Sequence, residues 1–585
     1  MSDVWVSDNG VEIRDLVPPQ DRRAWVARGY CPDRDLYTLF SGHVRRHPGR
    51  EAVVDSAGSL DYASLDAHVR RVAALLTEAG LGARDIIALS LPNGRNAVIA
   101  ELAVSAIGAV SLPYPPGRGR RDTLSLLGRS RASGAVFADP SDIASCARLP
   151  DVKAVFAFGR THTRTRSGVR SLDAPARGPW HPRPVDPEAP ARILVSSGSE
   201  AEPKMIAYSH NAMAGGRANY LRALHHGDGP MRNLVLVPLA SSFGSCGVPV
   251  TLAALGGTLL VRDSFDPAGV LRTITDHRPT HVLGVPTMLR RLADHPVLPG
   301  EDLRSLHAVV SSGASLPYAT ADACRGRFNR PVVTVYGSSD GVNCHTAATG
   351  LTPRTGTGRP DPAVAEIRII DDSDRDRTTD GRAGDDRAAD DRTIAPDEEA
   401  VGHCAHDRVL PPGQPGEICA RGPMTPLCYV ASPELDARYR TARGWVRTGD
   451  RGMLDAHGRL HVLGRLKQIV VRGGYNISPA EVERELGTHP AVAEVACVGV
   501  PDADLGERLC ACVREVPGTR APTLRALRVF LERERGLERR KLPELLLLVS
   551  DMPSGPTGKV CRRTLAALAS ERYAPRTDAV EIDAL

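Results

Sequence analysis

Hydrophobic and polar positions follow two rhythms along the first half of the chain: short runs rich in Val and Ile, and longer stretches with apolar residues at helical spacing. The short runs have the length of buried strands, and the longer stretches have the period of amphipathic helices. Strands and helices that take turns in this way predict an α/β fold with layered helices and mostly parallel strands. The expected strands lie near Ala52, Ile86, Val136, His307 and Pro331, and the expected helices begin near Leu65 and Ala97.

This rhythm stops in the segment from Asp371 to Arg408. The segment contains eleven Asp, two Glu and six Arg, and Ile394 and Val401 are almost its only large aliphatic residues. Such a composition cannot offset the entropy cost of ordering by burying apolar surface. We therefore expect a disordered, acidic and Arg-rich insertion over residues 371–408.

A different order of elements follows the insertion. Short strands are expected in GEICARG and GRLHVLGR, and after Gly464 the pattern predicts a strand, a helix, two strands and a second helix. This order describes a small α+β unit, within the usual size range of an independent domain. We place the boundary at Leu463, which divides the chain into residues 1–463 and 464–585.

Composition and charge narrow the class of protein. The chain has 585 residues, enough for several domains, and its 74 Lys and Arg against 69 Asp and Glu give a net charge of +5. This charge is too small and too dispersed to bind nucleic acid or an anionic membrane. The start resembles no secretory signal, no apolar run reaches a membrane span, and the twelve cysteines are scattered. These features predict a cytoplasmic protein with reduced thiols.

The most informative loop is ILVSSGSEAEPKMIAYSHN, in which Lys204 precedes an apolar strand. Small residues let the backbone approach an anion, hydroxyls donate to it, and a lysine adds a cation. It is not a Walker loop, because Pro203 and Met205 stand where that pattern needs Gly and Ser or Thr. The loop is consistent with a phosphate cradle or with a plain Ser/Gly-rich hairpin. The candidate phosphate-binding residues are Ser196, Ser197, Gly198, Ser199 and Lys204.

Four further motifs stand in order behind this loop: YGSSD at Tyr336, TGD ending at Asp450, GRLKQ at Gly464 and PTGKV at Pro556. Together the five motifs resemble the adenylate-forming superfamily of acyl- and aryl-CoA synthetases, peptide-synthetase adenylation domains and luciferases, and most closely its stand-alone aryl- and acyl-acid AMP ligases. The resemblance covers nearly the whole chain. It implies a large N-terminal domain of layered αβα subdomains with a small β-barrel-like sheet, hinged to a small α+β C-terminal lid domain.

The resemblance also implies an activity. A carboxylic acid would attack ATP to give an acyl adenylate and pyrophosphate, and the acyl group would then pass to a phosphopantetheine thiol of CoA or of a carrier protein. Catalysis of this kind consists mostly of positioning and of neutralising phosphoryl charge. Mg²⁺ is the implied cofactor, and Asp340, which stands where the family usually has Glu, would help to bind it.

Each motif implies roles for particular residues. Lys559 matches the mobile catalytic lysine of the lid, and Lys467 matches the hinge about which the lid swings. Gly473 and Gly474 would admit the pantetheine arm. The residues that would bind ATP, besides those of the phosphate loop, are Gly313, Tyr336, Gly337, Ser339, Asp450 and Arg465.

The segment VPLASSFGSCGVPV matches the part of the family that lines the acyl pocket. It has no acidic residue to pair with an ammonium, so an α-amino acid substrate is disfavoured. PLASSF stands where aryl-acid ligases have PLAHNF. This difference disfavours salicylate and dihydroxybenzoate as substrates. The short serines leave room for a bulkier ring or an alicyclic acid, unless they are loop residues that do not touch substrate. The candidate pocket residues are Ser241, Ser242, Phe243 and Gly244.

Two other functions stay open at this point. The insertion at 371–408 favours a fatty acyl-AMP ligase that does not use CoA, because that branch carries an insertion in roughly this region, although the segment here lacks apolar anchors. Asp340 and the unusual phosphate loop favour a non-catalytic binding paralogue, while Lys559, Asp450 and Lys467 together argue against it. No zinc is expected, since neither the Cys–His group near residue 404 nor the pair at Cys510 has a partner knuckle.

Overall fold

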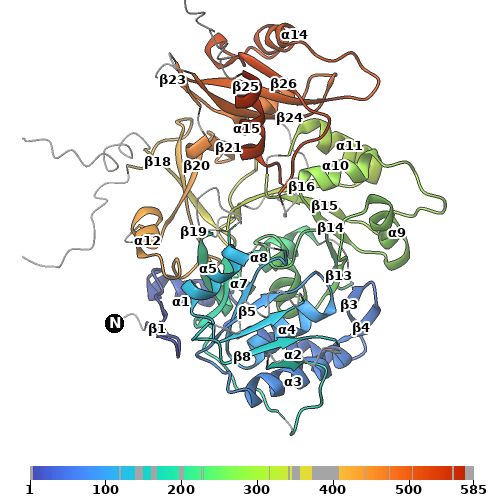
Figure 1. Cartoon of the computed structure of the whole chain (residues 1–585), viewed down its shortest axis with the longest axis vertical. Helices are drawn as coiled ribbons and strands as arrows, with labels where there is room; N and C mark the ends of the chain where they lie inside the picture. The colour runs from blue at the N-terminus through green and yellow to red at the C-terminus, as the bar shows by residue number, and fades with distance from the viewer. Residues whose placement is uncertain are drawn as a thin grey trace, which may run out of the picture.

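The structure is a computed structural model of the whole chain. It describes residues 4–117, 120–138, 149–159, 168–178, 180–196, 203–225, 227, 229–314, 316–339, 343–344, 356–371, 408–441, 443–468, 470–472, 475–502, 505–555 and 559–573. The N-terminal part forms the lower body of the molecule and the C-terminal part a smaller unit above it (Figure 1). The predicted α/β fold with a large N-terminal and a small C-terminal unit is confirmed.

A seven-stranded sheet carries the predicted phosphate loop at one edge. Its strands run parallel except for the two strands that flank the phosphate loop, which form an antiparallel hairpin. The central strands are buried on both faces, as their continuous apolar sequences predict. In spatial order the strands are β11 (Met205–Ser209), β10 (Pro190–Val195), β6 (Val110–Pro113), β5 (Ile86–Ser90), β7 (Gly134–Phe137), β8 (Ala154–Ala157) and β9 (Val169–Ser171).

An eight-stranded sheet lies beside it, again parallel in its interior and antiparallel at both edges. The strands expected from the Val- and Ile-rich runs near residues 52, 307 and 331 are all found in it. In spatial order the strands are β17 (Asn343–Cys344), β16 (Val332–Gly337), β15 (Ala308–Ser312), β14 (His281–Gly284), β12 (Arg232–Val235), β13 (Thr258–Val261), β3 (Glu51–Asp55) and β4 (Gly58–Asp61).

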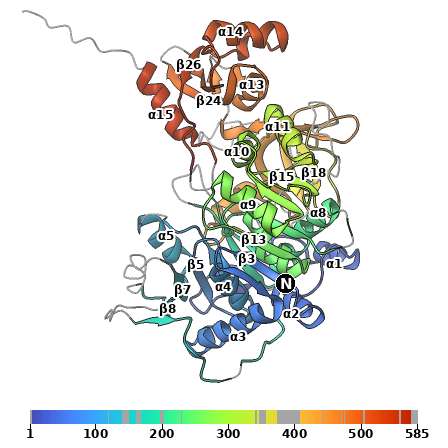
Figure 2. The same ribbon diagram turned by 90° about the vertical axis from the view of Figure 1, so that its right-hand side faces the viewer.

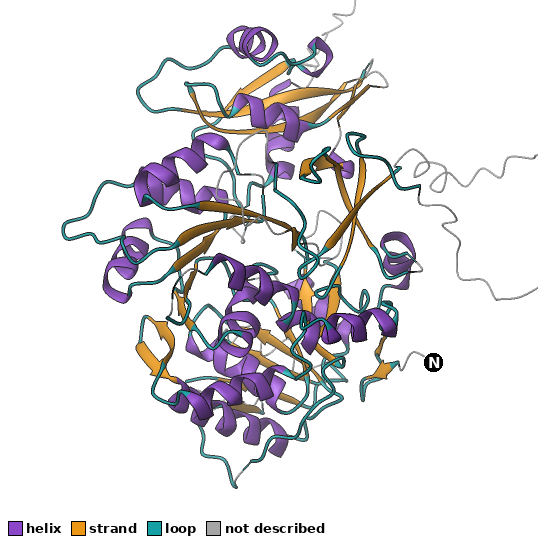
Figure 3. Ribbon diagram, turned by 180° about the vertical axis from the view of Figure 1, so that it is seen from behind, coloured by secondary structure: helices purple, strands orange, loops and turns teal. Residues whose placement is uncertain are grey.

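Helices cover these sheets and fill the space between them (Figure 3). The predicted helices are confirmed as α3 (Tyr62–Glu78) and α4 (Arg95–Ala106), and α3 begins at the Asp61 side chain, which accepts a hydrogen bond from the Ser64 amide at 2.7 Å. From Val98 to its end α4 is buried all round, because it packs against strands of both sheets. The other N-terminal helices are α1 (Pro19–Ala27), α2 (Leu36–Arg46), α5 (Arg120–Ser130), α7 (His210–Ala214), α8 (Gly216–Leu224), α9 (Pro267–His277), α10 (Pro286–Asp294), α11 (Tyr318–Phe328) and α12 (Pro433–Tyr439).

A four-stranded antiparallel sheet stands where the small barrel-like sheet was expected. The two ends of the predicted insertion meet beside it, since the Asp371 amide donates to the Arg408 carbonyl at 3.0 Å. Apart from these two ends, the insertion lies outside the described residues. The strands are β18 (Glu366–Ile370), β19 (Gly416–Arg421), β20 (Val446–Leu454) and β21 (Leu460–Arg465), and a short two-stranded sheet near the N-terminus pairs β1 (Trp5–Val6) with β2 (Glu12–Ile13).

The C-terminal unit has its own sheet (Figure 2). Two hydrophobic clusters of buried residues belong to this unit. Its elements are β22 (Val470–Arg472), β23 (Tyr475–Ile477), α13 (Pro479–Leu486), β24 (Val492–Asp502), β25 (Gly506–Glu515), α14 (Leu524–Val529), β26 (Leu545–Leu548) and α15 (Arg562–Tyr573). The expected second helix is α-helical only to Val529 and continues as a π-helical turn, Phe530–Glu534. The predicted boundary at Leu463 stays a prediction; β21 runs to Arg465 and β22 begins at Val470. Among the described helices, none combines the length and the apolar character that crossing a bilayer requires.

Candidate active site

The predicted nucleotide-binding residues gather where parallel strands of the eight-stranded sheet end, the edge at which open α/β sheets bind ligands. Tyr336 lies near the end of β16 and is half-buried. Its hydroxyl donates a hydrogen bond to Asp450 Oδ2 at 2.6 Å, although the two residues are far apart in sequence. Burial, and then the neighbouring Asp450 carboxylate, raise the pKa of the Tyr336 hydroxyl well above its usual value.

Asp450 lies in β20 with only 4% of its surface exposed. Its Oδ1 is 3.1 Å from Arg465 Nε, because β20 and β21 pair these two residues directly across the sheet. Its backbone amide donates to Thr448 Oγ1 at 3.0 Å. The carboxylate is therefore fixed between two donors, Tyr336 from the eight-stranded sheet and Arg465 from the four-stranded sheet.

Lys559 reaches this place from the C-terminal unit. The Gly555 amide donates to the Lys559 carbonyl at 2.7 Å, and Ser554 and Val560 form an antiparallel bridge. A Cβ atom on Gly313, at the end of β15, would lie 3.0 Å from Lys559 Cε and 3.6 Å from its Nζ. Desolvation, followed by the guanidinium of Arg465, lowers the pKa of the Lys559 ammonium, and Asp450 acts in the opposite direction. Glycine at 313 thus leaves the space that the lysine side chain occupies.

The predicted phosphate loop is a hairpin between β10 and β11. Ser196 and Lys204 close it with two hydrogen bonds, from the Ser196 amide to the Lys204 carbonyl at 2.9 Å and from the Lys204 amide to Ser196 Oγ at 3.1 Å. A strand follows the loop, as expected, so no helix dipole acts on it. Ser197, Gly198 and Ser199 lie outside the described residues.

Two tyrosines hold the Lys204 side chain. Its Nζ is 3.9 Å from the ring centroid of Tyr439, at the end of α12, and 5.5 Å from that of Tyr429. The two rings are 6.0 Å apart and tilted by 50°. Cation–π attraction of this kind fixes an ammonium without neutralising it. Sequence reasoning missed both tyrosines, because nothing in their spacing relates them to Lys204.

Replacing Tyr439 by leucine is expected to raise the KM for ATP about 5- to 20-fold while changing kcat less, because a partly desolvated cation–π contact contributes about 1–2 kcal/mol. Steady-state kinetics with ATP as the varied substrate measure this effect. Tyr439→Phe, which keeps the aromatic face, is the matched control and should stay close to the parent enzyme. Equal losses in the two variants would show that the ring does not orient Lys204.

The turn after β16 carries the residue predicted to donate to the α-phosphate. The Tyr208 hydroxyl, from β11, donates to the Ser339 carbonyl at 2.6 Å, so the phosphate hairpin and this turn are joined directly. Gly337 continues β16 and pairs with Asn343 in β17. Asp340, the predicted magnesium ligand, lies outside the described residues.

The predicted acyl-pocket segment is a turn through Ser241, Ser242 and Phe243 and becomes helical from Gly244 onwards. A 3₁₀ turn over Gly244–Cys246 continues as a π-helix over Gly247–Ala254. The Gly244 amide donates to Ser241 Oγ at 3.0 Å, and Ser242 Oγ donates to the Ser338 carbonyl at 3.3 Å. Phe243 is half-buried against the largest hydrophobic cluster. A Cβ atom on Gly244 would collide with the Pro238 carbonyl, which explains this glycine by packing.

Sequence reasoning also missed Arg217 in α8, whose buried guanidinium donates to the Ser242 carbonyl and to Ser245 Oγ. The sequence offers no signal for it, since one arginine in a short helix is usually exposed.

The predicted hinge and tunnel residues are less fully described. Lys467 lies in a 3₁₀ turn, Leu466–Gln468, between the last strand of the four-stranded sheet and the first strand of the C-terminal sheet. Its side chain, Gly473 and Gly474 lie outside the described residues. The two units also contact each other away from the hinge, where Arg291 Nη2 in α10 is 3.7 Å from Asp551 Oδ1.

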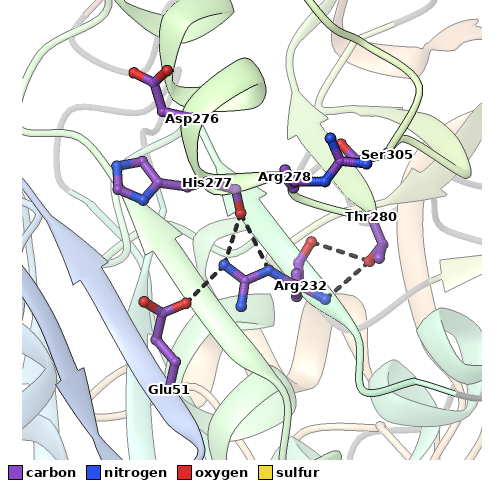
Figure 4. Close-up of a pocket in the computed structure, with 7 residues that line it drawn as sticks. All are labelled: Glu51, Arg232, Asp276, His277, Arg278, Thr280 and Ser305. Atoms are coloured by element: carbon purple, nitrogen blue, oxygen red, sulfur yellow. Dashed lines mark hydrogen bonds and ion pairs between the residues drawn. The ribbon is translucent and has the colours of Figure 1, made fainter.

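An open hollow of about 540 Å³ lies at the opposite, amino-terminal ends of the parallel strands (Figure 4). At its centre Arg232 is already paired with Glu51 Oε2 at 2.7 Å and donates to the His277 carbonyl at 2.7 Å. The hollow is lined by Glu51, Arg232, Asp276, His277, Arg278, Thr280 and Ser305, and contains none of the predicted site residues.

The chain matches two protein families in succession, one described as AMP-binding enzyme over residues 40–385 and one described as AMP-binding enzyme C-terminal domain over residues 481–559. It is 32% identical over 550 residues to triostin synthetase I of Streptomyces triostinicus, covering 93% of this chain and 96% of that protein.

It is also 30% identical over 576 residues to a salicyl-AMP ligase / salicyl-S-ArCP synthetase of Mycobacterium tuberculosis, covering 94% and 93% of the two chains. The structure of amide bond synthetase McbA from Marinactinospora thermotolerans superposes with a TM-score of 0.74 at 30% identity, over 90% of this chain and 99% of that one.

Proposed function

The chain belongs to the AMP-binding enzyme family, and we propose its function on that basis. As a member it is an adenylate-forming ligase of the acid–thiol type, which activates a carboxylic acid with ATP and transfers the acyl group to CoA or a carrier protein. We propose further that the acid is an aryl, alicyclic or medium-chain acyl acid. The residues around Asp450 are proposed to bind ATP and to catalyse the reaction.

The observation that carries this proposal is the meeting of Tyr336, Asp450 and Lys559 from three separate parts of the chain. A carboxylate fixed between two donors is suited to accept both hydroxyls of a ribose, a two-point contact that few other side chains can make. An ammonium delivered beside it can stabilise the negative charge that builds between an attacking carboxylate and a phosphate. The raised pKa of Tyr336 and the lowered pKa of Lys559 are shifts of the kind found at functional sites.

The remaining roles follow from position. Ser196 and Lys204 would hold the β and γ phosphates, with Ser339 at the α-phosphate. Tyr336 would lie against adenine, with the backbone at Gly313 on the other side. Arg465 would support the ribose and phosphate side of the site.

Mg²⁺ prefers hard oxygen ligands, and the hydroxyls of Ser196 and Ser339 are of this kind, as is the carboxylate of Asp340, the residue that follows Ser339 in the chain. Asp340 would hold it. When bound, the cation neutralises phosphate charge.

An aryl acid is supported by the salicyl-AMP ligase relative. Ser241 and Ser242 favour an acid other than salicylate, since the ligases that read its hydroxyl have His and Asn at these positions. Pyrophosphate exchange with aryl, alicyclic and fatty acids tests the first half-reaction. Detection of product with CoA, a carrier protein and a simple amine then identifies the acceptor.

The amine is included because the chain is 30% identical to an amide bond synthetase of the same fold. An adenylate that reacts with amines and with neither thiol would favour that second candidate. Exchange with fatty acids alone, without CoA transfer, would favour the fatty acyl-AMP ligase. No exchange with any acid, despite ATP binding, would favour the non-catalytic paralogue.

Replacing Lys467 by proline is expected to slow thioester formation about tenfold or more while leaving pyrophosphate exchange largely intact, because proline fixes φ at a position proposed to absorb the lid rotation. The two half-reactions are measured separately on one preparation. Lys467→Ala, which keeps backbone freedom, is the matched control. Equal loss of both half-reactions in the proline variant would argue against a hinge at Lys467.

A further inference from the structure

A buried arginine that the proposed reaction does not use lies against the acyl-pocket segment. Arg217, in α8, has 1% of its surface exposed. Its Nη1 donates to the Ser242 carbonyl and to Ser245 Oγ, and its Nη2 donates to Ser242 Oγ at 3.2 Å. The guanidinium is therefore held on the segment that lines the proposed acid site.

The charge of Arg217 is not balanced by the described part of the chain. No carboxylate of a described residue lies within 4.0 Å of it, whereas Arg192, equally buried, is paired with Glu101. Arg217 adds to the effects that lower the pKa of Arg192, after the larger effect of desolvation. Of these two buried guanidinium groups only that of Arg192 has a carboxylate partner among the described residues, and buried charges are normally paired because leaving them unpaired is costly.

The hydrogen-bonding capacity of Arg217 is also incomplete. Its Nε is buried and finds no acceptor among the described residues. A guanidinium has five N–H groups arranged to bind a carboxylate through two parallel hydrogen bonds. The hydroxyls of Ser242 and Ser245 are the partners that such an anion would replace, since short side chains can change rotamer to release their bonds.

Neighbouring side chains connect Arg217 to the turn that is proposed to meet the α-phosphate. Its Cζ is 5.6 Å from the ring centroid of Tyr208, whose hydroxyl donates to the Ser339 carbonyl. Ser242, which accepts from Arg217, donates to the Ser338 carbonyl. The guanidinium, the acyl-pocket segment and the turn proposed to meet the α-phosphate therefore form one connected network.

We infer that Arg217 is a specificity-determining residue that receives a second carboxylate on the acid substrate, so that the preferred substrates are aryl or alicyclic dicarboxylic acids. This inference rests on the proposed function and names the substrate class of the same site. An anion is favoured over a neutral oxygen because the surroundings hold excess positive charge. The same charge repels an ammonium, in agreement with the absence of an acidic residue from the segment.

The test compares matched acids in pyrophosphate exchange with the full chain. The probes are benzoate, the three benzenedicarboxylates, an acetyl-substituted benzoate, and cyclohexanecarboxylate with its dicarboxylate. At least one dicarboxylate should exceed its parent monocarboxylate in kcat/KM by about 30-fold or more, the usual range for a desolvated charge pair. Arg217→Met should reduce that ratio to near one, and Arg217→Lys should leave an intermediate ratio.

The controls separate specificity from folding. Arg222→Met removes an exposed arginine of the same helix and should keep the parent ratio. ATP-induced thermal stabilisation of each variant reports whether the nucleotide site is intact. Should Arg217→Met lower exchange with all acids equally, or the parent enzyme prefer monocarboxylates or the acetyl acid, the inference is overturned while the proposed function stands. Absence of exchange with every acid would instead overturn the proposed function.

Discussion

Replacing Lys559 by alanine is expected to lower pyrophosphate exchange about 100-fold or more, because preorganised charge at the point where negative charge develops accounts for losses of this size. The side chain lies beside Gly313 and within electrostatic reach of Asp450, so its removal withdraws the cation supplied by the lid. ATP binding, measured by calorimetry, should change much less, since most proposed nucleotide contacts come from the N-terminal part.

Lys541→Ala is the matched control for this prediction. Lys541 belongs to the same unit, and its Nζ is 2.8 Å from Glu481 Oε1, away from the site residues. Removing a partly exposed ion pair should cost little. Unchanged exchange in Lys559→Ala would remove this lysine from the mechanism, and a matching loss in Lys541→Ala would point to a general weakening of the unit.

Replacing Asp450 by asparagine is expected to lower kcat/KM for ATP about 100-fold or more, since each hydrogen bond to a charged group contributes about 1.5–3 kcal/mol and two would be lost or weakened. The change keeps the shape of the side chain but removes the charge that Arg465 and Tyr336 face. Steady-state kinetics with ATP as the varied substrate, together with a direct ATP-binding measurement, provide the test.

Two further variants serve as comparisons for the Asp450→Asn enzyme. Tyr336→Phe removes only the hydroxyl that donates to Asp450, so we expect a smaller loss, about tenfold or less. Asp322→Asn, at an exposed position of α11, should leave the kinetics unchanged. An Asp450→Asn enzyme with the parent KM for ATP would exclude Asp450 from ribose binding.

Replacing Lys559 and replacing Asp450 should change different kinetic quantities, because the two residues come from different units. Loss of Lys559 should affect the chemical step with ATP still bound, whereas loss of Asp450 should affect ATP binding itself. If both variants lost ATP binding equally, the lid would hold the nucleotide rather than complete the site after binding.

The class of fold and the location of the motifs could be predicted from the amino-acid sequence alone. Continuous apolar runs such as β5 must be covered on both faces, and the helical period of α3 permits only one buried side, so local pattern and burial agree. The motif residues Tyr336, Asp450 and Lys559 could be selected because the resemblance depends on residue type and order, which are properties of the chain alone.

Which distant side chains meet depends on the three-dimensional arrangement of the elements. The cross-strand pairing of Asp450 with Arg465 depends on the register of β20 and β21, and the contact of Lys559 with Gly313 depends on how the C-terminal unit is placed. The tyrosines around Lys204 and the arginine behind Ser242 have no periodic or motif signal. Their positions follow from packing between elements far apart in sequence, and packing energy is a property of the assembled surfaces rather than of any one segment.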